Sequence, residues 1–319
     1  MNIKGLIGNT PMIKINYEYE GKSGSIYTKL EYYNYTGSIK DRIALYIIEK
    51  ERKNGNLKPG QAIVEVTSGN TGISFSAIGA LFGHDVHIFM PDWVSLERRN
   101  LIEMYGAQVH LVSKEEGGFK RALELAEEFA NEHDAYRPLQ FDNPLNIEAQ
   151  YKSTGQEIID AVPGVNAFVS GIGTGGTLMG VGKRLKDNDP SSKIFALEPS
   201  TLSILKMGME EGSHLIEGIG DDFIPGIVDE NLIDDIVLID DCDAINMSKK
   251  IAKEFGLGVG ISSGANFLAS VIMDSDDLTI ATVFADDSKK YITTRLSEIS
   301  DENPKLLSNH IKLIDFEVI

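Results

Sequence analysis

The segment Val169–Thr177, which reads Val-Ser-Gly-Ile-Gly-Thr-Gly-Gly-Thr, decides the fold class. An apolar run ends in glycines, and a helical pattern follows over 176–186. Glycine lets a backbone approach an anion closely, and a helix N-terminus presents free N–H groups at the positive end of the helix dipole. The segment therefore predicts a strand, a phosphate-binding loop and a helix, with a simple tight turn as the alternative. It is not a Walker loop, since no Lys-Ser or Lys-Thr pair follows, and it departs from the dinucleotide fingerprint.

Short β-rich runs and longer helical runs alternate along the rest of the chain. Several β-rich runs are continuously apolar, as expected for strands buried on both faces of a parallel sheet. The predicted strands are Ser25–Glu31, Ala62–Val66, Val86–Met90, Gln108–Val112, Ala167–Ser170, Ile194–Glu198, Ile236–Ile239 and Leu278–Ala285. The predicted helices include Ser38–Lys53, Thr71–Phe82, Leu96–Tyr105, Gly118–Glu132, Gly176–Lys186 and Ala244–Phe255. We expect an α/β protein with open, twisted, mostly parallel sheets flanked by helices, and ligands at the carboxyl ends of the strands.

Length, charge and cysteine content narrow the function classes. The chain has 319 residues, which at roughly 150 residues per domain suggests two domains or one large α/β unit. Its formal net charge of −18 argues against nucleic-acid and anionic-membrane partners, since both are polyanions. The single cysteine, Cys242, excludes an internal disulfide and a cysteine-based zinc site, and the histidines lack metal-ligand spacing, so we expect no metal. Without a signal-peptide pattern or an apolar run of transmembrane length, a cytoplasmic location is expected.

Two further loops carry polar groups at the start of a helical pattern. Thr67–Gly72 holds three hydroxyls and an amide around a glycine, and this set can bind a carboxylate through hydroxyls and helix N-terminal amides. Ser, Thr and Asn are also the usual helix N-caps, so capping alone is the alternative. The same alternative applies to Gly260–Ala265.

Lys40 opens the helix predicted over 38–53. The positive end of the helix dipole disfavours a cation in the first turn, so this position would lower an amine pKa, as a Schiff-base lysine requires. The alternative is an exposed surface lysine.

Together these segments resemble the pyridoxal-phosphate enzymes of fold type II, specifically the cysteine synthase and cystathionine β-synthase family. The resemblance covers nearly the whole chain, from Gly8-Asn9-Thr10-Pro11 to about Arg295. The motifs that carry it are Gly37–Arg42, Thr67–Gly72, Met90-Pro91, Ser95–Arg99, Gln140–Pro144, Gly171–Thr177, Gly218–Gly220, Phe223–Pro225 and Gly260–Ala265. It implies a tryptophan synthase β-like fold in which a smaller, mobile domain (37–142, with 1–11) carries Lys40 and the Thr67–Gly72 loop. A larger domain (12–36 and 143–319) would carry the phosphate loop and Ser262, and the resemblance also implies a homodimer.

The resemblance assigns roles to individual residues. Lys40 is similar to the lysine that holds pyridoxal 5′-phosphate as a Schiff base and also moves the substrate Cα proton. Asn70 matches the residue that donates to the 3′ oxygen of the cofactor, and Ser262 matches the serine that faces its pyridine nitrogen. The positions that match the phosphate loop are Gly173, Thr174, Gly175, Gly176 and Thr177. The positions that match the substrate carboxylate site are Thr67, Ser68, Thr71 and Gln140.

A neutral serine opposite the ring nitrogen has a chemical consequence. It cannot hold that nitrogen protonated as a carboxylate would, so the ring is a weaker sink for a persistent carbanion. Prompt loss of a leaving group from Cβ is then favoured over transamination. The expected reaction is β-replacement through an α-aminoacrylate intermediate, which a nucleophile attacks in a second half-reaction.

Asp221 and Asp222 depart from the ordinary cysteine synthase pattern, which usually has small residues between Gly-Ile-Gly and Phe-Ile-Pro. Cystathionine β-synthases are more similar here, with an aspartate immediately before the phenylalanine, which favours Asp222. A carboxylate repels hydrosulfide, whereas water or a neutral thiol gains from a general base. The alternative is that both aspartates face solvent on an acidic protein. Milder departures are Tyr35-Thr36 and Asp286-Asp287-Ser288, where the family often has Pro-Gly and a glycine-containing loop.

We therefore expect an enzyme of sulfur amino-acid metabolism that combines cysteine, or serine, with water or a thiol. Its products would be hydrogen sulfide and serine or a thioether amino acid. The main alternative is an O-acetylserine sulfhydrylase that makes cysteine from sulfide. Less favoured alternatives are a serine or threonine dehydratase and a catalytically inactive partner-binding homologue, which would have no need to keep Lys40.

Overall fold

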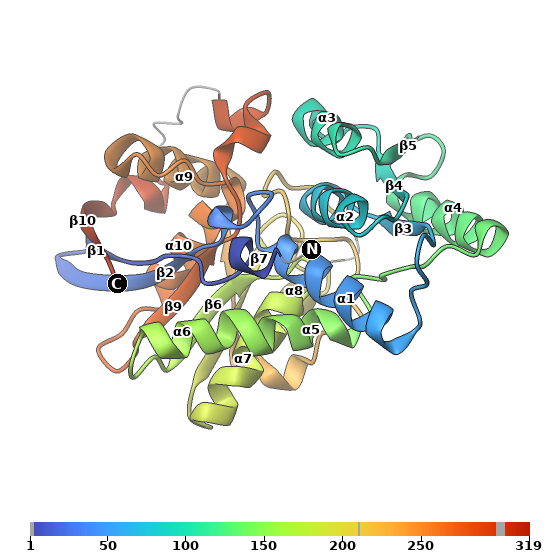
Figure 1. Ribbon diagram of the computed structural model, residues 1–319. Helices are drawn as coiled ribbons and strands as arrows, with labels where there is room; N and C mark the ends of the chain where they lie inside the picture. Colours follow the sequence, from blue (N-terminus) through green and yellow to red (C-terminus); the bar gives the residue numbers. More distant parts are fainter. Residues whose placement is uncertain (1–2, 210, 298–303) are drawn as a thin grey trace.

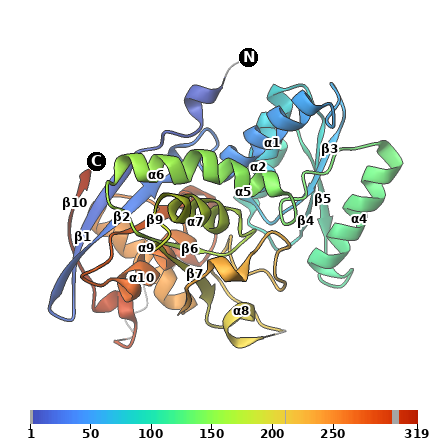
Figure 2. The ribbon, with the colours of Figure 1, turned by 90° about the horizontal axis from the view of Figure 1, so that it is seen from below.

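Two β-sheets organise the chain, and helices cover both faces of each (Figures 1 and 2). The computed structural model describes residues 3–209, 211–297 and 304–319. One sheet has seven strands in the order β10-β1-β2-β9-β6-β7-β8, and the other has three in the order β3-β4-β5. The strands are β1 (Met12–Tyr19), β2 (Lys22–Leu30), β3 (Ile63–Val66), β4 (Val86–Pro91), β5 (Gln108–Val112), β6 (Ala167–Gly171), β7 (Lys193–Pro199), β8 (Asp235–Ile239), β9 (Ile280–Phe284) and β10 (Lys312–Val318).

Most strand pairs are parallel, as the continuous apolar runs predict. From β2 through β9, β6 and β7 to β8 every neighbouring pair is parallel, and so are both pairs of the small sheet. Every residue of β9 and of β3 is buried. The strand β1 runs antiparallel to both of its neighbours, β2 and β10. The predicted fold class is therefore confirmed.

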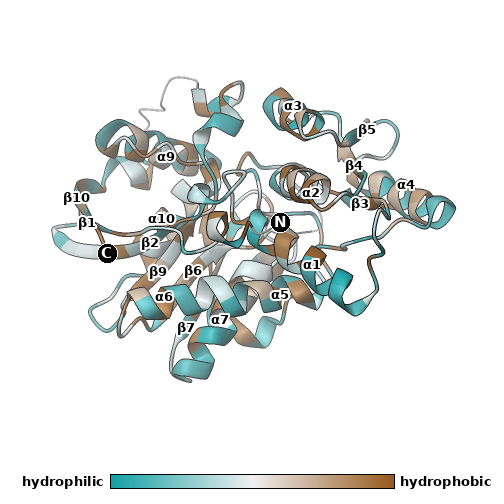
Figure 3. Cartoon of the chain, viewed as in Figure 1, coloured by the Kyte–Doolittle hydropathy of each residue, from teal (hydrophilic) through white to brown (hydrophobic). Residues whose placement is uncertain are grey.

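Helices follow the strands in the alternation that the sequence predicts. They are α1 (Lys40–Asn54), α2 (Asn70–Leu81), α3 (Leu96–Met104), α4 (Gly118–His133), α5 (Pro144–Gln150), α6 (Gln156–Ala161), α7 (Gly176–Asn188), α8 (Ile204–Met207), α9 (Asp241–Phe255) and α10 (Ile261–Met273). A π-helical turn, Tyr151–Gly155, joins α5 to α6. The helix α2 is mostly apolar (Figure 3), and its residues 71–79 are all buried.

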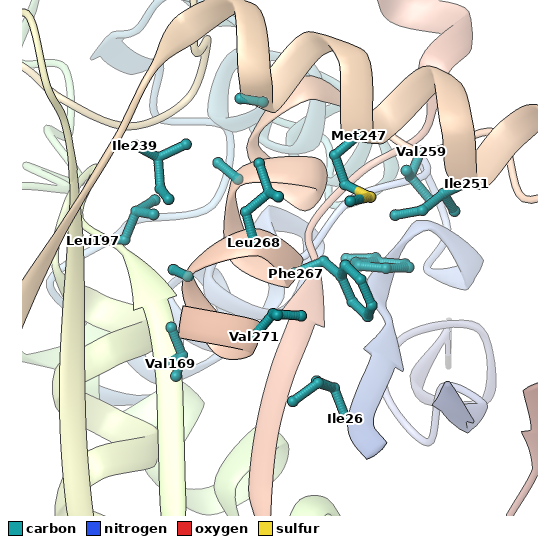
Figure 4. Packing of buried hydrophobic residues seen from close by; sticks show 14 of the residues in the cluster. Ile26, Val169, Leu197, Ile239, Met247, Ile251, Val259, Phe267, Leu268 and Val271 are labelled. Carbon is teal, nitrogen blue, oxygen red and sulfur yellow. The ribbon is translucent and has the colours of Figure 1, made fainter. Parts of the chain in front are cut away.

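Each sheet has its own apolar core. In the larger unit, Phe267, Leu268 and Val271 of α10 pack against Val169 of β6 and Leu197 of β7 (Figure 4). The helices α6 and α7 cover the opposite face with a second cluster. Around the small sheet, α1, α2 and α3 form one cluster and α4 forms another.

The N-terminal residues join the small unit. Ile3 and Ile7 are buried in the same cluster as α1 and α2, so the segment that contains these two residues packs against that unit. The exact domain boundaries stay a prediction. Among the described residues, no helix is both long and apolar enough to span a membrane.

All eight predicted strands are present, but β1 and β10 were not predicted. The last predicted strand is Leu278–Ala285, yet residues 312–318 also form a strand, the edge strand β10. Its partner β1 lies about 300 positions earlier in the chain, with Lys14 opposite Glu317. A pairing between segments so far apart cannot be predicted from a local sequence pattern. The acidic stretch Ser297–Asn303, whose composition favours a solvated linker, lies mostly outside the described residues.

Candidate active site

A cleft of about 980 Å³ opens between the two units at the carboxyl ends of β3, β6 and β9. This volume lies at the upper end of the range for sites that hold a cofactor and a small substrate. All the predicted site residues except Gly176 line this cleft. The contributing residues are Lys40, Thr67, Ser68, Asn70, Thr71, Gln140, Gly173, Thr174, Gly175, Thr177, Asp221, Asp222 and Ser262.

Lys40 lies inside this cleft at the first residue of α1. The residues before it are attached to the strand end of β9, because the Ile39 N–H donates to the Ala285 carbonyl at 2.9 Å. Gly37 has a φ of +83°, a left-handed conformation that favours glycine, and it turns the chain into the helix. The alternative of an exposed surface lysine is therefore excluded.

The electrostatic surroundings of Lys40 differ from those that the sequence suggested. Burial lowers the pKa of the Lys40 amine below its ordinary value. The carboxylates of Asp286 and Asp221 act in the opposite direction, and the Lys290 ammonium lowers the pKa further. The direction of the prediction is confirmed, but removal of the amine from water is the main cause.

The loop between β6 and α7 leaves no room for side chains at its glycines. A Cβ on Gly173 would lie 2.4 Å from the Gly218 carbonyl oxygen, and a Cβ on Gly176 would lie 1.9 Å from Asn146 Oδ1. Asn146 Nδ2 in turn donates to Thr174 Oγ1 at 3.0 Å. The loop is therefore closely packed behind its backbone, and it lines the cleft at the N-terminus of a 13-residue helix, which fits the binding of a phosphate group.

Asn70 and Ser262 reach the cleft from the first turns of α2 and α10. Asn70 Nδ2 donates to Asp286 Oδ2 at 2.7 Å. Its Oδ1 atom is buried and has no hydrogen-bond partner among the described residues. Ser262 is only 4% exposed and lines the cleft. Since Gly260–Ala265 opens a full helix, α10, its serine is held on a rigid element.

The predicted carboxylate-binding residues come together, partly through bonds to one another. The Thr71 hydroxyl donates to Gln140 Oε1 at 2.6 Å, and Gln140 Nε2 donates to the Val66 carbonyl at 2.8 Å. Thr67 Oγ1 accepts from the Gly69 N–H at 3.0 Å. A bound carboxylate could therefore accept a hydrogen bond from the Thr71 hydroxyl only if the Thr71–Gln140 hydrogen bond were broken.

Asp221, rather than Asp222, faces Lys40. Asp222 is exposed, whereas Asp221 is partly buried and acts on the Lys40 amine. Burial and the neighbouring charge of Asp222 raise the pKa of Asp221 to about 6, and the Lys40 cation opposes that rise. The Gly220 N–H donates to the Ile172 carbonyl at 2.8 Å, which attaches this segment to the phosphate loop.

Arg98 is a residue of the cleft to which the sequence analysis gave no role. Its guanidinium donates to the Ser68 carbonyl at 3.0 Å, forms a salt bridge with Glu217 and lies 5.2 Å from the Tyr291 ring centroid. Ser95–Arg99 was among the motifs of the resemblance, but these contacts join segments up to about 200 residues apart. Among the described residues, no group of three or more His, Cys, Asp or Glu side chains is placed to hold a metal ion.

Comparisons with known proteins agree on the family. Residues 3–282 match the family model described as pyridoxal-phosphate dependent enzyme. Cysteine synthase from Staphylococcus aureus is 41% identical over 306 residues, covering 94% of this chain and 98% of that protein. A hydrogen sulfide-producing enzyme from Fusobacterium nucleatum has a structure with 46% identity and a TM-score of 0.96, covering 99% of this chain and 97% of that chain. A second structure also has 46% identity and a TM-score of 0.96, and the match covers 99% of this chain and 98% of that chain. It is a variant of a hydrogen sulfide-producing enzyme in which asparagine replaces an aspartate, in complex with an α-aminoacrylate intermediate.

Proposed function

This chain belongs to the pyridoxal-phosphate-dependent enzymes of the cysteine synthase family, and we propose that it releases hydrogen sulfide from L-cysteine by putting water in place of the thiol. Its cofactor is pyridoxal 5′-phosphate and its reaction class is β-replacement. The products are L-serine and hydrogen sulfide. A thiol in place of water would give a thioether amino acid by the same route. The observation that carries the proposal is the Asp221 carboxylate beside Lys40 in the cleft.

The residues present fit the cofactor. The glycine loop before α7 suits its phosphate, Asn70 suits its ring oxygen, and the Ser262 hydroxyl suits its ring nitrogen. Lys40 would hold it covalently. When bound, the cofactor withdraws electrons from the substrate α-carbon and so supports loss of the α proton and of the β substituent.

The side chains of the chain supply binding and proton transfer. Thr67, Ser68 and the N-terminal amides of α2 bind the substrate carboxylate. Lys40 Nζ takes the α proton and later returns it to the same carbon. The C–S bond of cysteine breaks and the sulfur leaves as hydrosulfide, which becomes hydrogen sulfide by taking up, through solvent, the proton that water loses in the next step. A C–O bond to the water oxygen then forms as one water proton passes to Asp221.

Asp221 suits the role of general base for water. With a pKa of about 6 it is ionised at neutral pH, and it binds a proton more strongly than an ordinary aspartate. Its negative charge would repel hydrosulfide and so disfavour the reverse use of sulfide as nucleophile. Asp222, which the sequence pattern favoured, raises the pKa of Asp221 by its charge, and we assign it that secondary role.

The similar proteins support hydrogen sulfide release more than cysteine formation. The Fusobacterium enzyme, at 46% identity, is described as hydrogen sulfide-producing. The variant with an aspartate changed to asparagine holds an intermediate, which is the result expected where a carboxylate is needed to complete turnover. The Staphylococcus cysteine synthase, at 41% identity, supports the alternative of an O-acetylserine sulfhydrylase.

A product assay tests the proposal. The purified enzyme is given L-cysteine alone, L-serine with sulfide, and O-acetyl-L-serine with sulfide, and sulfide, serine and cysteine are quantified by chromatography. We expect equal amounts of serine and sulfide from cysteine, at a kcat/KM above that for cysteine formation. Lys40→Ala protein corrects for the uncatalysed reactions. Turnover with O-acetylserine and sulfide only would contradict the proposal and favour the sulfhydrylase.

A homodimeric state and a cytoplasmic location stay predictions that rest on the sequence.

A further inference from the structure

Asp286 is a buried acidic residue directly after Ala285, a lining residue of the cleft, and it has no role in the reaction as described above. It follows the strand β9 and is only 1% exposed. Its Oδ2 atom accepts from the Asn70 amide at 2.7 Å and from the Tyr291 hydroxyl. One carboxylate oxygen therefore has two donors, and one of these donors is the predicted partner of the cofactor ring oxygen.

The backbone of Asp286 connects two further parts of the site. Asp286 forms an isolated β-bridge with Ser38, two residues before Lys40. Its carbonyl accepts from the Gly260 N–H at 3.0 Å, two residues before Ser262. A Cβ on Gly260 would lie 2.0 Å from Asp286 Oδ1, so the approach requires glycine there. Asp286 is thus in contact with all three segments that carry Lys40, Asn70 and Ser262.

The second carboxylate oxygen is the unexplained feature. Among the described residues, Asp286 Oδ1 is buried and has no hydrogen-bond partner. A buried carboxylate oxygen without a donor is costly, so its retention calls for an explanation such as a functional role. The described cations around it are Lys40 and Lys290, and Arg98 lies over the ring of Tyr291.

We propose that Asp286 is a positioning residue that orients the Asn70 amide and supplies the negative charge that holds a proton on Lys40 Nζ. A carboxylate accepts hydrogen bonds only, so it must face the amide nitrogen of Asn70. The Asn70 amide also forms a hydrogen bond with the Tyr291 side chain, so Asp286 and Tyr291 together fix its orientation. For Lys40, an adjacent carboxylate strengthens an amine that burial alone would make a weak base. The inference rests on the proposed role of Lys40 as proton acceptor.

The charges that face Lys40 make the direction of the effect clear. Burial and Lys290 lower the pKa of the Lys40 amine, whereas Asp286 and Asp221 raise it. Replacing Asp286 with asparagine removes one of two supporting charges and keeps nearly the same shape. The amine should then lose its proton at a lower pH.

The test measures the titration of Lys40 in the cofactor-free protein. A small amine-reactive reagent labels the apoprotein across a pH series, and mass spectrometry of the Lys40 peptide gives the pH midpoint of labelling. We expect Asp286→Asn to lower that midpoint by about one pH unit, since Asp286 is the largest of the charges that raise the pKa of Lys40 and a nearby opposite charge shifts a pKa by about 1–3 units. The matched control is Asp287→Asn, which removes the same charge one residue later and is not among the groups that act on Lys40. We expect no shift in the control.

A midpoint in Asp286→Asn equal to that of the wild type, or an equal shift in Asp287→Asn, would overturn the proposal. Should Asp286→Asn not fold, as judged by circular dichroism, Tyr291→Phe decides. This variant keeps the Asp286 charge but removes the Tyr291 hydroxyl, which donates a hydrogen bond to the Asp286 carboxylate. The carboxylate should then stabilise the Lys40 cation more strongly, so the pH midpoint of Lys40 labelling should rise. An unchanged or lower midpoint would count against the proposal. The labelling experiment needs no substrate, so its result does not depend on which reaction the enzyme catalyses. An error in the proposed reaction would appear in the product assay instead.

Discussion

At the scale of single residues, the chemistry depends first on Lys40. We expect Lys40→Ala to abolish β-replacement and the visible absorbance of lysine-bound cofactor, because Lys40 is the one described lysine that both lines the cleft and begins a helix. Borohydride reduction followed by peptide mass spectrometry would locate the cofactor in the wild type. The matched control is Lys53→Ala, in the last turn of the same helix, which should retain both properties. Activity close to that of the wild type in Lys40→Ala would refute the assignment.

Asp221 belongs to the same scale, and its titration gives a pH signature. Since a general base must be deprotonated, and the pKa of Asp221 is raised to about 6, kcat with cysteine should fall as the pH decreases through about 6. Asp221→Asn should remove this dependence and lower steady-state turnover by about 10²–10⁴-fold, the usual contribution of positioned acid–base catalysis. It should still release a first equivalent of sulfide in a rapid-mixing experiment.

The control for Asp221 is Asp222→Asn, which should change kcat by only a few fold. It should also move the acidic limb of the profile to lower pH, because the charge of Asp222 helps to raise the pKa of Asp221. If Asp222→Asn loses turnover and Asp221→Asn does not, the roles of the two are exchanged. The sequence alone favoured Asp222 from its place in a motif, since the direction in which adjacent side chains point depends on how the segment packs.

At the scale of elements, the phosphate loop depends on glycine at a backbone contact. A methyl group on Gly173 would lie 2.4 Å from a carbonyl oxygen of the segment at Gly218, so the loop must shift. Such overpacking typically costs about 1–3 kcal/mol. We expect Gly173→Ala to weaken cofactor binding about tenfold or more, measured by absorbance during titration of the apoprotein. Gly5→Ala is the control, since a Cβ there meets nothing within 4 Å; equal affinities in both variants would exclude the close approach.

The elements also show what a sequence can reveal. Strands such as β9 and the loop before α7 were predictable because buried apolar runs and glycine clusters are local signals. By contrast, β10 pairs with β1 across nearly the whole chain, and Gly260–Ala265 showed a helix start but not the buried helix α10 behind it. The importance of Asp286 was hidden for the same reason. The sequence marked it as a departure from the family, but its partners Asn70 and Tyr291 come from different elements.

At the scale of the whole molecule, the cleft is bridged by contacts between its two walls. Arg98 of α3, in the unit with the small sheet, forms a salt bridge with Glu217 on the opposite wall and also donates to the Ser68 carbonyl of the substrate loop. The Arg98 side chain is 4% exposed and that of Glu217 is 29% exposed, so water screens the pair only in part. A second bridge, in which Glu97 accepts from Thr293 at 2.7 Å, is exposed.

These bridges predict that closure of the two units supports substrate binding. Loss of a charge-assisted hydrogen bond costs about 1.5–3 kcal/mol, so Glu217→Gln should raise KM for cysteine about tenfold or more by loosening Arg98 and, through it, the loop at Ser68. Cofactor affinity should not change, because the phosphate loop, Lys40 and Ser262 lie outside this contact. The matched variant Glu97→Gln removes a charge from the exposed bridge and should change KM by less than about twofold, as is usual for surface contacts. Steady-state kinetics and cofactor titration of both variants separate the two effects. A parallel loss of cofactor in Glu217→Gln would show that the pair maintains the fold of the cleft instead of its closure on substrate.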